Sequence, residues 1–181
     1  MIMKEFLKEE RFAFISDKNK DFIVEFTKAL NEFRYDFSGE IGDGYCWGRY
    51  MIIYSKVGVK TKQVIARFYL RDDKEYTFGK GQTYKFDKKS IVLRLFLNKI
   101  DKHISYIEKA PEHIKDKFIS DKGLCKQCTQ SYQKCHHYKK YTIDSIEREK
   151  CGYVFCFEDP KIEHLKDYVD LLKEFYGSKR S

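Results

Sequence analysis

Apolar residues recur every three or four positions near the start of the chain. Between residues 21 and 34 this spacing places them on one face of an α-helix. Ser16, Asp17 and Asn19 precede the stretch and are typical N-cap residues. The pattern therefore predicts a helix with one buried side. Its apolar stripe consists of Phe22, Ile23, Phe26, Ala29, Leu30 and Phe33.

The period changes to two in the next part of the chain. Segments 50–54, 64–70 and 91–97 are rich in β-branched and aromatic residues, and a turn at Gly58 separates the first two. This pattern predicts a meander of antiparallel strands. Before it, the glycine-rich segment 38–44 predicts an exposed loop. In the third strand we expect one face to form the core, namely Ile91, Leu93, Leu95 and Leu97.

Helical spacing returns after residue 98. Asn98 and Asp101 resemble a capping pair, and Pro111 predicts the start of a second short helix that buries Ile114 and Phe118. After residue 152, segment 153–157 predicts a short strand.

A closing helix follows this strand. Asp159 is predicted as its N-cap, Pro160 as its first residue and Gly177 as its stop. The chain as a whole predicts an α+β fold, an antiparallel sheet flanked by helices. We expect a single domain over 1–181, with a cysteine-rich metal-binding insertion over 120–152, before the last strand and helix.

The insertion contains a zinc-knuckle-like cysteine pattern. Cys125 and Cys128 are separated by two residues, Cys135 lies seven positions further, and Cys151 sixteen beyond that. Thiolates at these positions complete a closed tetrahedral site, which is typical of structural zinc. The insertion has few apolar residues of its own, so a cross-link is needed to hold its shape. We predict one structural Zn²⁺ per chain, bound by these four cysteines.

Several alternatives remain open for the cysteines. His136 or His137 could replace one thiolate, and four cysteines can also hold an iron–sulfur cluster. The Cys125–Cys128 pair could instead be a redox dithiol, or all the thiols could simply pack. We expect Cys46 and Cys156 to be packing thiols.

The chain carries a formal net charge of +8, with fourteen Tyr and fifteen Phe. Positive charge favours an anionic partner, and aromatic rings can stack on bases. Segment 132–141 combines lysines with tyrosines, and we expect it to form a basic loop that contacts nucleic acid or a protein partner. AT-rich codon usage, which enriches Lys, Ile, Tyr, Phe and Asn together, and an ordinary solvated loop are the alternatives.

The first ten residues carry charges throughout, and no apolar run approaches the length of about 18 residues that a membrane span needs. We therefore expect no membrane association, and a cytoplasmic protein of bacterial type. In a reducing compartment, six cysteines indicate metal ligands or buried thiols rather than disulfides.

The order of elements resembles that of small bacterial α+β proteins of the YdhG/YdeI-like type. Segments 109–115, 123–125, 150–153 and 167–172 carry the resemblance, which covers about two thirds of the chain and excludes the cysteine insertion. It implies an antiparallel sheet flanked by helices. No catalytic or binding residue is implied.

Neither a His-Glu-x-x-His nor a Gly-x-Ser-x-Gly motif occurs in the sequence. His113 and His164 are predicted on solvated helix surfaces without a special role. The first functional hypothesis is a non-enzymatic binding module with a structural zinc site. The rival is an enzyme or small-molecule sensor with a pocket near Trp47, Tyr50 and Arg94, between sheet and helices.

Overall fold

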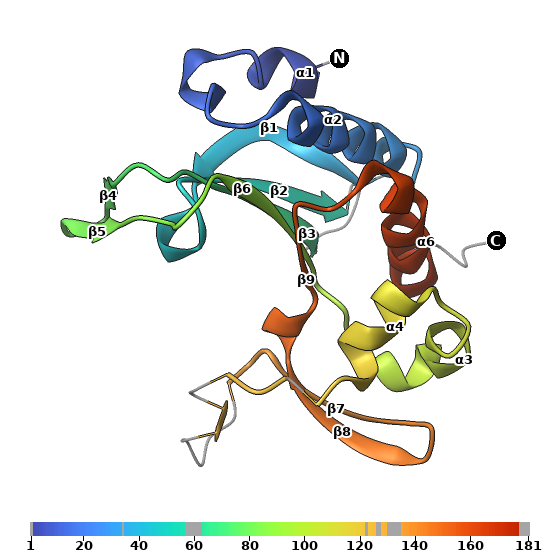
Figure 1. Cartoon of the computed structure of the whole chain (residues 1–181). Coiled ribbons are helices and arrows are strands. Elements are labelled where there is room, and N and C mark those ends of the chain that lie inside the picture. The colour runs from blue at the N-terminus through green and yellow to red at the C-terminus, as the bar shows by residue number, and fades with distance from the viewer. Residues whose placement is uncertain are drawn as a thin grey trace.

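A computed structural model of the chain (Figure 1) describes residues 2–33, 35–56, 63–121, 123–125, 128–129 and 135–177. The fold is α+β, as the sequence predicts. The helices are α1 (Ile2–Phe6), α2 (Asp17–Asn31), α3 (Ile104–Ile107), α4 (Glu112–Ile119) and α6 (Leu165–Tyr176). The strands are β1 (Tyr35–Asp43), β2 (Tyr50–Lys56), β3 (Val64–Arg71), β4 (Tyr76–Phe78), β5 (Gln82–Tyr84), β6 (Ser90–Leu95), β7 (Tyr138–Ile143), β8 (Ile146–Cys151) and β9 (Cys156–Glu158).

The main sheet has five strands in the order β1-β2-β3-β6-β9, and every neighbouring pair is antiparallel. Strands β4 and β5 form one separate hairpin, and β7 and β8 form another. The turn predicted at Gly58 lies outside the described residues. Among the described residues, no helix is long and apolar enough to cross a membrane.

Helices α1, α2 and α6 lie over one face of the main sheet (Figure 1). The predicted first helix is confirmed as α2, because its apolar stripe is buried against this face. It begins where the Ser16 hydroxyl accepts a hydrogen bond from the backbone amide of Asn19, at 3.3 Å. This helix and the sheet enclose the main core.

Cross-strand rows of apolar side chains build the covered face of the sheet. Ile52, Phe68, Leu93 and Phe157 are register partners on four consecutive strands, and all are buried. Each fully buried side chain of this size contributes about 1.5–3 kcal/mol. The predicted core positions of the third segment are confirmed, since Ile91, Leu93, Leu95 and Leu97 are all buried.

The opposite face of the sheet carries a second, smaller cluster. Met51, Tyr69 and Val92 are buried there, with Trp47, Ile53 and Cys156 packed around them. Strand β6 is therefore buried on both faces, whereas the alternation in its sequence predicts one core face. The polar residue at the centre of this second face is Arg94, which is only 2% exposed.

Segment 38–44, predicted as an exposed loop, belongs largely to strand β1. Its partner is β2, and a register shift between Phe37 and Ile41 accommodates the extra residues of the glycine-rich stretch. Backbone pairing with a neighbouring strand therefore overrides the low strand propensity of glycine and acidic residues. The loop prediction is wrong here.

Hairpin β7–β8 was not predicted. Its two-residue turn consists of Asp144 and Ser145, both with positive φ of 51° and 60°. Positive φ at both turn residues matches the right-handed twist of paired strands. The hairpin is attached to α4 by Tyr141, whose hydroxyl donates to the carbonyl of Phe118 at 2.7 Å.

The residues predicted to cap the next helix also contact this hairpin. Asp101 accepts a hydrogen bond from the backbone of Thr142 at 3.3 Å, and Asn98 accepts one from Lys139 at 2.7 Å. The capping prediction is wrong, because a left-handed Lys99 with φ of 57° precedes the helical turn instead. The second helix is confirmed as α4, with Pro111 directly before it.

Asp159 does not cap the closing helix either. Its backbone has a positive φ of 43°, and its Oδ1 accepts hydrogen bonds from the Ile91 amide and the Asn19 side chain, both at 3.0 Å. A 3-10 turn at Ile162–His164 separates Asp159 from α6. The predicted strand is also displaced, since a 3-10 turn at Gly152–Val154 precedes β9.

Candidate metal centre

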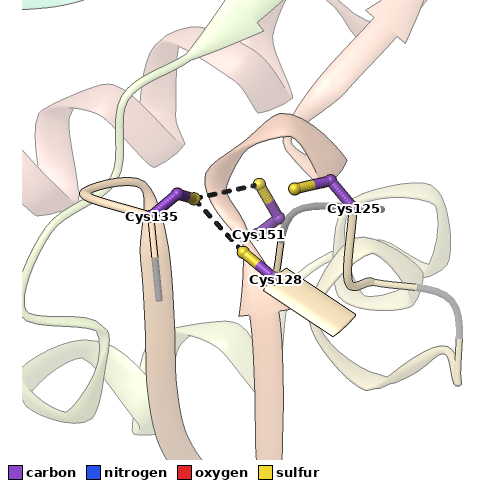
Figure 2. A group of neighbouring side chains, drawn as sticks. All are labelled: Cys125, Cys128, Cys135 and Cys151. Carbon is purple, nitrogen blue, oxygen red and sulfur yellow. Dashed lines mark hydrogen bonds between the residues drawn. The ribbon is translucent and has the colours of Figure 1, made fainter. Parts of the chain in front are cut away.

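The four cysteines predicted as ligands come together in the structure. Their sulfur atoms all lie within 4.8 Å of one another (Figure 2). Cys128 and Cys151 are buried, and Cys125 and Cys135 are half-buried. Cys135 precedes β7 and Cys151 ends β8, so hairpin formation itself brings these two thiols to the same end.

Local hydrogen bonds position each thiol. The backbone amide of Thr129 donates to the carbonyl of Cys125 at 3.1 Å, which closes a turn around the Cys-x-x-Cys pair. At the hairpin, the amide of Tyr138 donates to the carbonyl of Cys135 at 2.8 Å, and Tyr138 is the register partner of Cys151. Turn and hairpin therefore present their sulfurs toward a common centre.

Two glycines allow these segments to approach closely. The backbone amide of Cys151 donates to the carbonyl of Gly123. The backbone amide of Gly152 donates to the carbonyl of His137 at 2.7 Å. A Cβ atom on Gly123 would overlap the side chain of Lys150, which is buried and donates to the carbonyl of Ser120. A larger residue at position 123 would therefore require the buried Lys150 side chain to move.

The sulfur separations suit a metal ion. The Sγ atoms of Cys128 and Cys135 are 3.2 Å apart, and those of Cys135 and Cys151 are 3.9 Å apart. In a tetrahedral thiolate site with metal–sulfur bonds of about 2.3 Å, neighbouring sulfurs lie about 3.8 Å apart. None of the six cysteines, all of which are described, forms a disulfide. The group therefore provides four soft donors in a compact arrangement that could hold a metal.

Burial disfavours the ionised form of two of these thiols, Cys151 and Cys128. It raises the pKa of Cys151 to about 12, and the neighbouring Cys125 and Cys135 add to this effect. A hydrogen bond from the backbone of Tyr153 to Cys151 acts in the opposite direction. Burial likewise raises the pKa of Cys128. A cation between the sulfurs is what would ionise them, because its charge compensates for the lost hydration.

The two adjacent histidines lie elsewhere. In the described part of the chain, the donor atoms of this group are all cysteine sulfurs. His136 is exposed, whereas the ring of His137 lies edge-on to Tyr153 with centroids 5.0 Å apart. The geometry therefore favours ligation by four thiolates over the variant with a histidine.

The remaining cysteines lie outside this group. Cys156 packs against the second cluster of the sheet, as predicted, and burial raises its pKa to about 11. Cys46 is half-buried in the 3-10 turn Tyr45–Trp47.

A feature missed by sequence reasoning lies on the same face as Cys156. Arg67 on β3 and Arg94 on β6 are direct register partners. The guanidinium group of Arg94 lies 3.9 Å from the ring centroid of Tyr153, and Arg67 lies 5.1 Å from that of Phe96. The Nε atoms of both arginines are buried and have no hydrogen-bond partner among the described residues. We call these two residues the arginine pair.

Basic and aromatic groups surround the arginine pair. Trp47 stacks on Tyr153 with centroids 4.5 Å apart and an interplanar angle of 16°. Burial, Arg94, His136, Lys139 and Arg67 lower the pKa of His137 to about 4. Burial and Arg94 also lower the pKa of Lys139. Three basic side chains, Arg67, Arg94 and Lys139, therefore lie close to His137.

The pocket predicted near Trp47, Tyr50 and Arg94 is not formed by these three residues together. Tyr50 lies toward the helices and packs against Phe12, with centroids 5.1 Å apart. Trp47 and Arg94 both contact Tyr153 on the opposite face of the sheet.

No family model, curated protein or solved structure matches this chain. The resemblance to YdhG/YdeI-like proteins therefore stays a prediction, and the functional argument rests on the geometry.

Proposed function

We propose that this chain is a non-enzymatic module that binds single-stranded nucleic acid, with a structural zinc ion at Cys125, Cys128, Cys135 and Cys151. The observation that carries the proposal is the arginine pair, which has no acidic partner in the part of the chain that the structure describes and lies among aromatic rings. The zinc ion would stabilise the segment that supplies Tyr153 and His137 to this face.

Zinc is the metal that the donor set suits best. Four thiolates in a closed tetrahedral arrangement leave no position for water or substrate, which is the pattern of structural zinc sites. Iron–sulfur ligation also uses four cysteines, and metal analysis distinguishes the two. Cysteine ligands of this kind persist in a reducing compartment, so the proposal implies a cytoplasmic protein.

Phosphate is the ligand that the arginine pair suits. In the described part of the chain, neither Arg67 nor Arg94 forms an ion pair with a carboxylate, and the two lie directly opposite each other. Like charges at such a position destabilise a sheet, and a buried unpaired charge is costlier still. Guanidinium groups bind phosphate through two parallel hydrogen bonds, so a phosphate bound at the half-buried Arg67 would offset the repulsion from the buried Arg94, which donates to the Tyr69 hydroxyl at 3.3 Å.

Stacking would supply the second part of the interaction. Trp47 and Tyr153 are half-buried and therefore expose part of their rings beside the arginine pair. Bases of a single strand stack on such rings at about 1–3 kcal/mol each, with little dependence on sequence. The predicted basic loop 132–141 is wrong for residues 138–141, which belong to strand β7 because they pair with β8. His137 and Lys139 face the same region as the arginine pair. The net charge of +8 would attract the strand over longer distances.

The test is fluorescence anisotropy with labelled oligo(dT) and oligo(U) at low and at physiological salt. We expect binding that weakens steeply with salt, because phosphate contacts release counterions. Arg67→Met should weaken binding at least tenfold. Arg11→Met is the matched control, because Arg11 is partly exposed and paired with Glu9 at 2.7 Å.

Absence of binding at low ionic strength would end the proposal, as would equal losses in Arg67→Met and Arg11→Met. Equal affinity for a polyglutamate peptide of the same charge would assign the face to an acidic protein partner instead.

A further inference from the structure

Three side chains with metal-binding atoms meet on the helical side of the molecule. His113 belongs to α4, His164 lies at the end of the 3-10 turn before α6, and Asp167 lies in the first turn of α6. One ligand atom from each lies within 4.8 Å of the others. The sequence predicts both histidines on solvated helix surfaces, yet all three residues are half-buried.

The distances in this group suit an ion better than direct hydrogen bonds. Oδ2 of Asp167 lies 3.4 Å from Nε2 of His113 and 3.4 Å from Nδ1 of His164. Good N–H···O hydrogen bonds measure about 2.7–3.2 Å, so both contacts are long. Around a tetrahedral ion with bonds of about 2.0–2.1 Å, neighbouring ligand atoms lie about 3.4 Å apart. Both contacts match that separation.

His113 adds an independent observation. Its Nε2 atom is inaccessible to solvent and makes no hydrogen bond within the described residues. A buried polar atom without a hydrogen bond costs about 1–3 kcal/mol. This atom points toward Asp167, where a cation would satisfy it.

The surrounding helices hold the three residues in place. His164 and Asp167 are three positions apart, so they share one face of the chain as it enters α6. The His113 ring is fixed from α4, edge-on to Tyr168 with centroids 5.8 Å apart, and lies 3.9 Å from the His164 ring centroid. The site is therefore largely formed before any ion arrives.

We propose that His113, His164 and Asp167 form a second metal site, which binds a divalent transition-metal ion such as Zn²⁺, Co²⁺ or Ni²⁺. Two imidazoles and one carboxylate suit these ions, and three protein ligands leave a coordination position open for water or an exchangeable ligand. This site differs from the closed cysteine group, and it does not depend on nucleic-acid binding.

The experiment uses tag-free protein with one equivalent of zinc at the cysteines, titrated with Co²⁺. We expect one further equivalent, with a d–d spectrum but without the sulfur-to-cobalt charge transfer that thiolate ligands produce. His164→Asn should weaken this binding at least tenfold. His103→Asn is the matched control, since His103 lies near a helix end, pairs with Glu174 at 2.9 Å, and is outside the group.

A wild-type protein that binds no second equivalent would overturn the proposal. So would a second equivalent that His164→Asn and Asp167→Asn leave unchanged. A Cys125→Ser, Cys128→Ser double variant separates the two sites, because it should lose the cysteine-bound metal and still bind one Co²⁺ through the histidines.

Discussion

Arg67 and Arg94 lie directly opposite each other on β3 and β6, and neither forms an ion pair with a carboxylate in the described part of the chain. Like charges in direct register repel, so the charges themselves do not stabilise the sheet. In the proposed function, a bound phosphate offsets this repulsion, and the pair costs stability when no ligand is bound.

The repulsion between Arg67 and Arg94 predicts that removing one of the two charges stabilises the folded protein. Arg67→Met keeps the aliphatic packing and removes one of the two charges, so it should raise the free energy of unfolding by about 0.5–1 kcal/mol. Urea denaturation without nucleic acid measures the change. A loss of stability would show that the contact of Arg67 with Phe96 outweighs the repulsion.

Loss of the proposed zinc ion should destabilise the protein. A ligand that binds only the folded state at about 100 times its Kd contributes about 2.7 kcal/mol. Cys128→Ser and Cys151→Ser should therefore each lower the unfolding free energy by about 3 kcal/mol in the presence of zinc. Elemental analysis should find one zinc per chain in the wild type and none in these variants.

Cys46→Ser is the control for this series, because Cys46 lies outside the group. It should keep its zinc and most of its stability. Zinc retained by Cys128→Ser would contradict the assignment of ligands.

Gly123→Ala should disturb the junction between the Cys-x-x-Cys turn and the hairpin. The added methyl group would overlap the buried Lys150 side chain, at an expected cost of about 1–3 kcal/mol. Gly42→Ala, on β1, is the control, because a Cβ there meets no atom within 4 Å. Thermal unfolding and zinc affinity of both variants check the prediction, which fails if the two behave alike.

Asp159 links three parts of the fold. Its Oδ1 accepts from the Ile91 amide and from Asn19 at the start of α2, so Asp159→Ala should cost about 1–3 kcal/mol. Asp159→Asn should cost less, since asparagine keeps an acceptor oxygen and tolerates the positive φ. Chemical denaturation of both variants measures their unfolding free energies. If Asp159→Ala and Asp159→Asn lose equal stability, the negative charge of Asp159 matters rather than its acceptor oxygen.

Much of the architecture follows from periodicity in the sequence. Helices α2 and α4 and strands β2, β3 and β6 each bury apolar residues at a regular spacing, and each was predicted. Strand β1 and hairpin β7–β8 were missed, because backbone pairing holds them together and their residues are glycine-rich or charged. The Asp144–Ser145 turn has no glycine to mark it.

The proposed sites also differ in how far the sequence alone predicts them. Cysteine spacing alone predicted which four thiols would meet, because few other residue types serve as soft ligands. The arginine pair depends on the register between β3 and β6, and the second proposed metal site joins residues 113 and 164. Such long-range neighbours become visible only once the strands and helices are placed.

The position of the hairpin within the chain order has a consequence for folding. Strand β9 pairs with β6, yet the whole segment with α3, α4 and the cysteines is synthesised between them. Closing a long loop costs entropy, and a cross-link within that loop shortens it. Under the proposed assignment of zinc, metal binding by the nascent chain should therefore accelerate the final strand pairing, and the rate at which the sheet is completed should depend on the supply of free zinc.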